Sequence, residues 1–426
     1  MKKVLIISPH FPPSNLAAVH RSRLFAQHLP AFGWEPVILA VHEDYYEEKL
    51  DPNLAALLPE GLRVEKVAAF QVSKPRFIGD IGLRGFFQLY KKAKRIIREE
   101  QIDFLYIPIP SFYVALLGRW LHFSTGVKYG IDYIDPWVHH FAGSDRMFSR
   151  HWFSTKLSSF LEPIAVKRAS LITGVAEGYY GGVKDRNPHL LEKAVFGAMP
   201  YGGEMIDYQK VNTLSIEPYL FRRNEKFQLV YAGAMLPKAY GPLEQIFKVI
   251  ADHPQQFSDL EIHFIGTGKL ANDSNSFNIK PIAKKFGLWK TVVFEYPQRI
   301  PYLDVLIHLR AADGIFILGS TEPHYTPSKV YQGVMSGKPV FAVLHQESQA
   351  LKVLQQARAG VVIAFDGEAG LDTISENFSA TFEQYRKFVK EFSTEQVDIG
   401  AFEQYSAYAV TRQLASLIDL AVEKNS

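Results

Sequence analysis

The chain has 426 residues, too many for one ordinary hydrophobic core, so two domains are predicted. Hydrophobic residues make up 47% and charged residues 21%, which fits a folded globular protein and excludes a disordered one. The 47 Lys and Arg residues against 44 Asp and Glu residues leave too little net charge to indicate a nucleic-acid partner, and the absence of cysteine excludes disulfides, thiol nucleophiles and Cys-ligated metals.

The first residues predict a buried strand rather than a leader peptide. Val4 to Ile7 is an apolar run that stops at Ser8-Pro9, whereas a secretory signal needs ~7–15 apolar residues before its cleavage site. No apolar run reaches the ~18 residues that a membrane helix requires. We therefore expect a cytoplasmic protein, and the lack of cysteine suits a reducing compartment.

The N-terminal half of the sequence alternates between strand and helix patterns. A helical pattern from Val19 to Leu29 lies between the first strand and a second apolar run, Pro36–Ala40, and this order predicts a parallel sheet. The same patterns predict a helix over 83–98 and strands over 104–107, 129–133 and 171–175.

A second alternating series begins at Phe227, after a polar and irregular stretch that starts near residue 199. Its later strands are expected near 260–265, 292–294, 314–318, 339–343 and 361–364, and a long helical pattern over 402–422 closes the chain. We predict two Rossmann-like α/β domains, over 1–205 and 206–400, that face a cleft. A C-terminal helix over 401–426 is expected to pack back toward the first domain.

Ligands of such domains bind outside the carboxyl ends of the strands, so the turns that follow strands hold the candidate sites. In the first domain, Pro13, Ser14 and Asn15 form the loop between the first strand and the first helix, and Arg21 follows shortly after. An arginine there can pair with a phosphate or a carboxylate, and a proline-stiffened surface loop with a solvated arginine is an equal alternative. The loop lacks the G-x-G-x-x-G pattern of dinucleotide binding.

Two glycine turns follow strands of the second domain. Gly233 ends the strand that begins at Phe227, and Lys238 comes soon after, so backbone and cation can both approach a diphosphate. Gly266 and Gly268 follow the next strand, where plain turns of this kind are also common. Neither turn identifies a site by itself.

The residues from Gly319 to Val340 carry the most chemical information. A polar loop that contains Glu322 and Thr326 follows a strand, and a helix is expected to begin at Ser328 beside Lys329. The free N–H groups of a helix start, a hydroxyl and a lysine can together hold a diphosphate, and Glu322 can accept hydrogen bonds from sugar hydroxyls. An ordinary N-cap with a loop glutamate is the alternative.

This set of motifs resembles the retaining GT-B glycosyltransferases of the family-4 kind, also called group 1. The resemblance rests on Ala311-Ala312-Asp313, Pro327-Ser328-Lys329 with Gly337-Lys338-Pro339-Val340, Val230–Gly233, Phe264–Gly268 and Pro200–Gly203, and in the first domain on His10–Arg21 and Ile131–Trp137. It covers nearly the whole chain, and its specificity lies in the order and spacing of the motifs. It implies the GT-B fold, with an acceptor-binding N-terminal domain and a C-terminal domain that binds a nucleotide-sugar donor.

The resemblance implies transfer of a sugar from a nucleotide-diphosphate-sugar to a glycan, a lipid-linked or a small-molecule acceptor, with retention of configuration, as in polysaccharide biosynthesis. We expect Lys238, Lys329 and the amides near Ser328 to stabilise the departing diphosphate. Asp135 can orient or deprotonate the acceptor hydroxyl, and capping of a turn is an equal alternative for it. We expect no metal and no other cofactor, because the adjacent His139-His140 lacks ligand spacing and no D-x-D stands at a suitable place.

Three positions depart from the family pattern. His324 and Gln332 stand where the family often has two glutamates, and Ala234 stands where it often has an arginine. A non-catalytic glycosyltransferase-like subunit that binds a partner or a sugar is therefore one alternative function. A nucleotide-sugar epimerase of the same fold is another, whereas a dehydrogenase is disfavoured because the glycine fingerprint is missing.

The segment 74–98 is the most basic part of the chain. It contains eight Lys or Arg residues and a single acid, Asp80, with aromatic residues between them. Such a segment can rest on anionic lipid at the inner face of a membrane or hold a lipid-diphosphate acceptor. A solvated helix face is the alternative.

Overall fold

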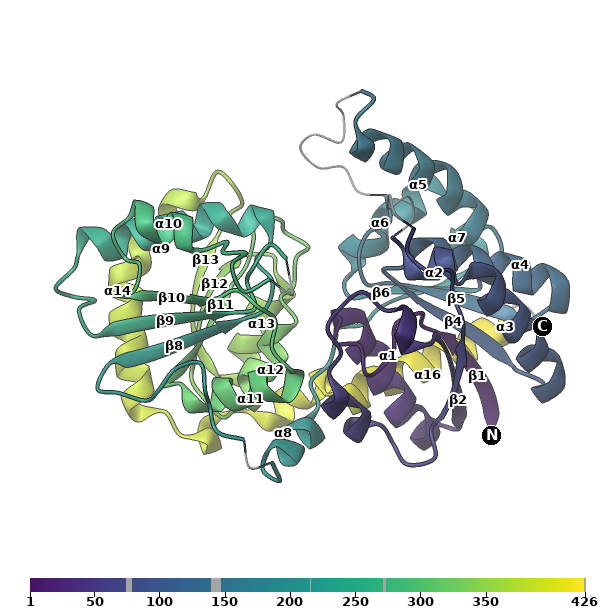
Figure 1. The fold of residues 1–426 in the computed structure, drawn as a ribbon, viewed down its shortest axis with the longest axis horizontal. Coiled ribbons are helices and arrows are strands. Elements are labelled where there is room, and N and C mark those ends of the chain that lie inside the picture. Colours follow the sequence, from purple (N-terminus) through teal and green to yellow (C-terminus); the bar gives the residue numbers. More distant parts are fainter. Residues whose placement is uncertain (74–78, 139–146, 215, 271–272, 425–426) are drawn as a thin grey trace. The chain divides into compact units, whose positions relative to one another are not determined.

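The chain folds into two compact units in the computed structural model, which describes residues 1–73, 79–138, 147–214, 216–270 and 273–424. One unit is Met1–Tyr201 with Ala407–Ser426, and the other is Gly202–Ser406 (Figure 1). Both ends of the chain therefore contribute to the first unit. His139, His140 and residues 74–78 of the basic segment lie outside the described residues.

The first unit contains a parallel sheet of seven strands in the order β3-β2-β1-β4-β5-β6-β7. The strands are β1 (Lys2–Ile7), β2 (Trp34–Val41), β3 (Arg63–Val67), β4 (Phe104–Ile109), β5 (Lys128–Tyr133), β6 (Leu171–Gly174) and β7 (Val195–Ala198). The central strands β1, β2 and β4 are almost entirely buried, because helices cover both faces of the sheet.

Helices pack on both faces of this sheet (Figure 1). One face is covered by α2 (Ile81–Arg84), α3 (Phe86–Glu100), α4 (Ala115–Thr125), α5 (Arg150–Val166), α6 (Glu177–Arg186) and α7 (Leu190–Lys193). The other face is covered by α1 (Ala17–His28) and α16 (Ala407–Glu423). The unit is thus a three-layer α/β/α domain.

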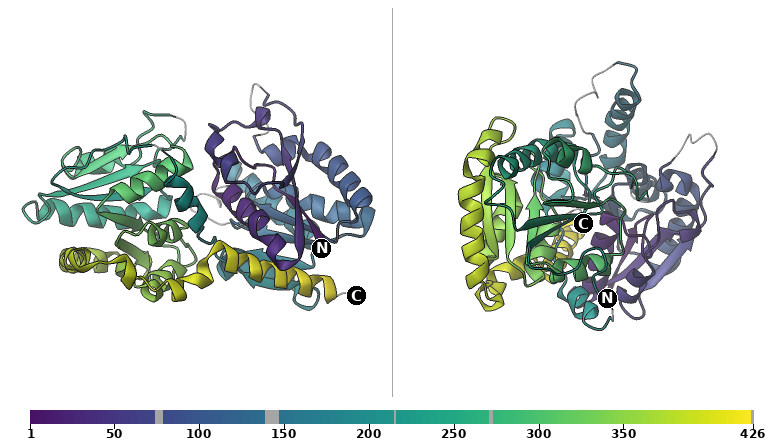
Figure 2. Two further views of the ribbon diagram at one scale, coloured as in Figure 1. Left: turned by 90° about the horizontal axis from the view of Figure 1, so that it is seen from below. Right: turned by 60° about the vertical axis from the view of Figure 1, so that its left-hand side comes forward.

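The C-terminal helix α16 is part of the core of the first unit. Val410, Leu414 and Ile418 are buried in one cluster with Phe25 of α1 and Trp34 of β2. Figure 2 shows α16, in yellow, running beside α1, in purple. The last helix of the chain therefore closes the face of the sheet that α1 alone leaves partly open.

The second unit contains a parallel sheet of six strands in the order β10-β9-β8-β11-β12-β13. The strands are β8 (Phe227–Ala232), β9 (Leu260–Ile265), β10 (Val293–Tyr296), β11 (Gly314–Leu318), β12 (Val340–His345) and β13 (Gly360–Phe365). One face packs against α9 (Tyr240–Asp252), α10 (Lys280–Lys285) and α14 (Leu371–Glu391). The remaining helices are α8 (Met205–Val211), α11 (Tyr302–Ala311), α12 (Lys329–Met335), α13 (Gln349–Ala357) and α15 (Ile399–Phe402).

The predicted α/β class is confirmed, and several boundaries differ from the prediction. The helix expected over 83–98 is interrupted at Gly85, where an added Cβ would lie 2.9 Å from Val41 Cγ2 of β2, so the chain approaches the sheet too closely for a side chain. The helix expected over 402–422 is likewise broken before Ala407. Among the described residues, no helix combines the length and the apolar character needed to cross a bilayer.

Candidate functional site

The sheet of the second unit has a topological switch point between β8 and β11. From β8 the chain proceeds to β9 and β10 on one side, whereas β11 lies on the other side of β8 and leads to β12 and β13. Open parallel sheets bind ligands outside the carboxyl ends of the strands at such a point. The loops after β8 and β11 hold the predicted donor residues Gly233, Lys238, Glu322, Thr326, Ser328 and Lys329.

Lys329 is the most unusual residue of this region. Its Nζ has almost no exposed surface and has no hydrogen-bond partner among the described residues. It lies 3.7 Å from the centroid of the Tyr231 ring, at the end of β8. Burial lowers the pKa of Lys329 to about 7. The site therefore contains a buried amine that is able to pair with a negatively charged group.

Gly233 lies against this lysine. Its φ of 124° is one that side chains rarely allow, and an added Cβ would lie 3.3 Å from Lys329 Nζ. The Gly233 amide donates to the carbonyl of Ile265 at 2.8 Å, which joins the turn after β8 to the end of β9. The structure thus brings Gly233 and Lys329 together, although they are far apart in the sequence.

Thr326 and Ser328 lie in the loop that leads to Lys329. Thr326 is only 3% exposed, and its hydroxyl has no partner among the described residues. Ser328 is the residue before α12, but its side chain makes no capping hydrogen bond. The helix expected to start at Ser328 begins at Lys329 and ends at Met335. The Thr326 hydroxyl and Lys329 Nζ are two buried polar groups of this stretch that have no hydrogen-bond partner among the described residues.

Lys238 and Glu322 join the loops after β8 and β11. Lys238 Nζ lies 3.5 Å from a carboxylate oxygen of Glu322, and the lysine side chain is 49% exposed. The Thr321 amide also donates to the carbonyl of Lys238 at 3.1 Å. A long contact to a half-exposed lysine contributes little stability, so Lys238 can exchange its carboxylate partner for a ligand at small cost.

The turn with Gly266 and Gly268 is held by a residue that the sequence analysis did not identify. Glu295 is buried at the end of β10 and accepts a hydrogen bond from the Thr267 hydroxyl at 2.9 Å. It also accepts from the amides of three consecutive residues at the start of α10, Asn278, Ile279 and Lys280. A buried glutamate in an apolar strand was the available signal, because such a carboxylate needs several donors.

In the first unit, the corresponding switch point lies between β1 and β4. Ser14, predicted on the acceptor side, is fully buried, and its hydroxyl donates to the carboxylate of Glu48. The Asn15 side chain contacts His20 Nε2 at 3.2 Å, and Pro13 is partly buried beside Ser14. The side chains of Ser14 and Asn15 are therefore engaged within the protein.

His10 is a further residue of this loop that the sequence analysis passed over. Its Nδ1 is buried and lies 2.9 Å from Glu48 Oε1, at ion-pair distance. Burial alone would raise the pKa of Glu48, but the interactions with His10 and Ser14 outweigh it and lower this pKa to about 2. Because the Nδ1 atom of His10 is buried, the exposed 24% of this side chain belongs to its other atoms.

Arg21 has a structural place in the first unit. It is fully buried and contacts both carboxylate oxygens of Asp132, at 2.5 and 3.0 Å. Its Nη1 donates to the carbonyls of Met199 and Pro200 at 3.0 and 2.7 Å. Contact with an acceptor, as expected from the sequence, finds no support here, because the guanidinium is enclosed and already paired.

Asp135 follows β5 and keeps solvent access. The protein atoms around it nevertheless disfavour its charged form and raise its pKa to about 6. Its neighbour Trp137 is buried and stacks on Phe112 at 6.0 Å between ring centroids, which fixes the segment next to Asp135. A carboxylate with such a pKa is mostly ionised at neutral pH and can accept a proton.

Within the described residues, no three His, Asp or Glu side chains lie together as a metal site would require. Metal independence stays a prediction.

No protein-family model matches the chain, and a search of curated proteins finds no match either.

Several solved structures share the fold of the whole chain. HepE from Anabaena in complex with UDP and glucose superimposes with a TM-score of 0.63 at 13% identity, over 98% of this chain and 100% of that one. Sucrose-phosphate synthase from Thermosynechococcus elongatus gives 0.62 at 11% identity, over 98% of both chains. A glycosyltransferase from Rickettsia africae gives 0.57 at 15% identity, over 100% of this chain and 99% of that one.

These similarities, together with the two parallel sheets, define the architecture. The chain has the GT-B fold, in which two Rossmann-like domains follow each other along the chain. The prediction of the fold class is confirmed.

Proposed function

We propose that the chain is a glycosyltransferase that moves a sugar from a nucleotide-diphosphate-sugar to an acceptor hydroxyl. The observation that carries this proposal is the buried, unpartnered Nζ of Lys329 at the β8–β11 switch point. A diphosphate provides a negatively charged partner for this amine. The GT-B fold supports the same assignment, since HepE, which shares it, has been solved with UDP-glucose.

The proposed chemistry assigns a task to each donor residue. The bond between the anomeric carbon and the diphosphate oxygen breaks, and the nucleotide diphosphate leaves with the electron pair. Lys329 and Lys238 stabilise the charge that develops on it, and the Thr326 hydroxyl donates a hydrogen bond. Gly233, Gly266 and Gly268 let the backbone approach the donor, the amide of Ser328 contributes to the phosphate site, and Glu322 accepts from the sugar hydroxyls.

On the acceptor side, the acceptor oxygen bonds to the anomeric carbon and its proton passes to a base. Asp135 is the proposed base, because it is exposed just after β5 and its pKa of about 6 makes it a stronger base than an ordinary aspartate while it stays mostly ionised at neutral pH. Retention of configuration, hexosyl transfer and independence from metals are the finer parts of the proposal. Measurement of the anomeric configuration of the product and of the activity in EDTA tests them.

The acceptor is proposed to be a glycan or a lipid-linked sugar that the enzyme meets in the cytoplasm at the membrane surface. The part of segment 74–98 that the structure describes supports peripheral contact, because Lys91, Arg95 and Arg98 are exposed on α3.

A thermal-shift screen against UDP-, GDP-, ADP- and TDP-sugars tests donor binding, since a ligand of the folded state raises the melting temperature. We expect a shift with at least one of them, and UDP-glucose is the first choice. Product analysis with the bound donor then separates the candidate functions. A glycosyltransferase uses the donor only with an acceptor or slowly hydrolyses it, an epimerase converts the donor alone, and a binding subunit leaves it unchanged. The proposal fails if none of these donors is bound.

A further inference from the structure

The helices α3, α4 and α5 lie side by side over one face of the first sheet, with α4 in the middle (Figure 1). Leu89 of α3, Leu117 of α4 and Ala165 of α5 are fully buried on the side of each helix that faces the sheet. The opposite sides point away from the sheet and together form what we call the outer-helix surface. Its composition is unusual for a solvated face.

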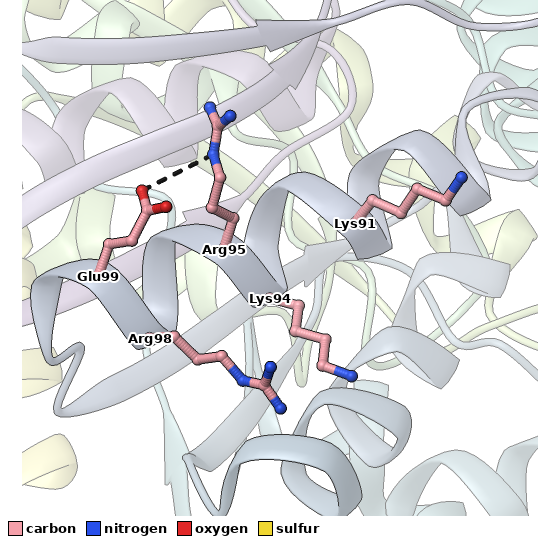
Figure 3. A pocket seen from close by; sticks show the side chains of 5 residues that line it. All are labelled: Lys91, Lys94, Arg95, Arg98 and Glu99. Carbon is pink, nitrogen blue, oxygen red and sulfur yellow. Dashed lines mark ion pairs between the residues drawn. The ribbon is translucent and has the colours of Figure 1, made fainter.

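Basic residues follow one side of α3. Phe87, Lys91, Lys94 and Arg98 recur at intervals of four, three and four residues, which places them in one row along the helix. Figure 3 shows three of these cations with Arg95 and Glu99. These five charged residues line an open depression of about 340 Å³.

The four cations that line the depression keep most of their positive charge unpaired. Arg95 lies 3.7 Å from Glu99, one turn further along the helix, as the dashed line in Figure 3 marks. Lys91, Lys94 and Arg98 form no ion pair with any carboxylate in the part of the chain that the structure describes. Four cations and one acid therefore leave this part of the outer-helix surface with a net positive charge.

Large apolar side chains stand next to these cations. On α4, Phe123 is 85% exposed and Trp120 is 43% exposed. On α5, an exposed row at helical spacing consists of Phe153, Leu157, Phe160 and Ile164. Soluble surfaces rarely gather this many exposed apolar side chains on adjacent helices, and such patches mark interaction sites.

We infer that the outer-helix surface docks the protein on an anionic lipid bilayer, with the cations of α3 at the headgroups and the aromatic side chains of α4 and α5 in the interfacial layer. Lysine and arginine beside exposed Trp and Phe form the pattern that binds the boundary between headgroups and acyl chains. This inference extends the proposed function, because a protein that uses a lipid-linked acceptor has to meet the bilayer. Only the biological purpose of docking rests on the proposed function, since binding to a bilayer requires neither donor nor acceptor.

Other occupants fit the surface less well. A soluble polyanion would use the cations but would leave Phe123 and Phe160 without a role. In a symmetric dimer through the same patch, the basic row of one copy would face the basic row of the other. Glu99 is the one acid lining the depression, so most of these charges would repel each other. An anionic bilayer uses both features at once.

The test is co-sedimentation of the full chain with vesicles made of phosphatidylcholine alone or of phosphatidylcholine with about 30% phosphatidylglycerol. The ionic strength is kept at about 0.15 M, so that only charges close to the bilayer contribute. We expect binding to the anionic vesicles only. Lys91→Glu/Lys94→Glu/Arg98→Glu should lower the partition coefficient about 100-fold or more, since each basic residue near an anionic surface contributes on the order of a factor of five. Phe123→Ser/Phe160→Ser should lower it about 10-fold or more at unchanged net charge, because two exposed aromatic side chains that enter the interfacial layer on binding are lost.

Matched variants separate these effects from general charge and hydrophobicity. Lys248→Glu/Lys387→Glu/Lys390→Glu changes the net charge equally through exposed lysines of the second unit, and Leu420→Ser/Ile399→Ser removes two exposed apolar side chains elsewhere. Both should bind vesicles like the wild type.

The inference is overturned if the wild type does not bind anionic vesicles, if the matched charge variant loses binding equally, or if the Phe variant binds unchanged. A dimer in solution that Phe123→Ser/Phe160→Ser abolishes would also overturn it and assign the surface to a second copy. Thermal shifts with UDP-glucose on the same variants report the donor site separately, so either proposal can fail alone.

Discussion

At the scale of single residues, Lys329 combines a stability cost with the binding role that we propose for it. Burial lowers its pKa to about 7, whereas a lysine in the unfolded chain has a pKa near 10.5. The unfolded chain therefore binds more protons than the folded chain between these two values, and stability should rise with pH across this window. In the proposed function, the diphosphate of the donor pairs with this amine and offsets the cost of its burial.

We predict that Lys329→Met binds UDP about 10- to 100-fold more weakly, because a charge-assisted contact to phosphate is lost. Wild-type affinity should fall as pH rises through about 7, since the free amine loses its proton there, and the affinity of the variant should vary much less. Isothermal titration calorimetry from pH 6 to pH 9 measures both. Lys248→Met, on the exposed side of α9, is the control and should bind like the wild type. Equal affinities of Lys329→Met and wild type would contradict the assignment.

Arg21 illustrates the opposite case, a cation that is buried and fully paired. We predict that Arg21→Met destabilises the first unit by about 3–5 kcal/mol, because Asp132 is left buried without its partner. Arg21→Met/Asp132→Asn should recover part of this loss. Urea unfolding followed by circular dichroism measures the change, and UDP affinity, a property of the second unit, should not move. If Arg21 instead contacts the acceptor, the variant stays stable and its KM for acceptor rises.

At the scale of elements, the order of strands and helices could be predicted because each buried strand is a short apolar run. Strands over 260–265 and 314–318 coincide with β9 and β11. The edge strands β3 and β7 were missed. β3 consists of Arg63–Val67, whose charged residues are tolerated because an edge strand is only partly covered.

The candidate site was predictable only in part, for a similar reason. Glycines and lysines in turns after strands are visible in a sequence, so Gly233 and Lys329 could be proposed. Their contact depends on two distant loops that meet at the switch point. Glu48 could not be singled out, because burial and not residue type makes this acid special, and the same holds for the enclosure of Arg21. Glu295 left one signal in the sequence, its place in an apolar strand, but its partners became visible only in the structure.

Glu295 gives a test of how an element supports the site. It holds the turn Gly266–Gly268 through Thr267 and satisfies three amides at the start of α10. We predict that Glu295→Gln lowers the free energy of unfolding of the second unit by about 1–3 kcal/mol. The NH₂ group of glutamine is itself a donor, so it cannot accept the hydrogen bonds that one carboxylate oxygen now accepts. Glu244→Gln, which removes an exposed ion pair with Lys285, should cost less than about 1 kcal/mol. Equal effects of the two variants would contradict this role.

At the scale of the whole molecule, the two units differ in how the chain builds them. The second unit is one continuous segment, Gly202–Ser406, with its own sheet and core. The first unit needs both ends of the chain, because α16 is buried against α1 and β2. Loss of the C-terminal helix should therefore affect one unit only.

We predict that a chain truncated after Ser406 unfolds its first unit and keeps its second. Removal of α16 exposes Phe25 and Trp34, which are otherwise buried against Val410, Leu414 and Ile418. Each of these contacts contributes on the order of 1–3 kcal/mol, and their sum approaches the total stability of a domain. Calorimetry should show one of two transitions lost, and limited proteolysis should degrade the region before Gly202 first.

The isolated segment 202–406 provides the matching experiment, because every donor residue named here lies within it. It should fold alone and bind UDP in a way that Lys329→Met abolishes, yet transfer no sugar, since the proposed base Asp135 belongs to the other unit. A folded segment that does not bind UDP would show that the donor site draws essential contacts from the first unit. Binding by the segment would instead show that the β8–β11 switch point suffices to hold the nucleotide.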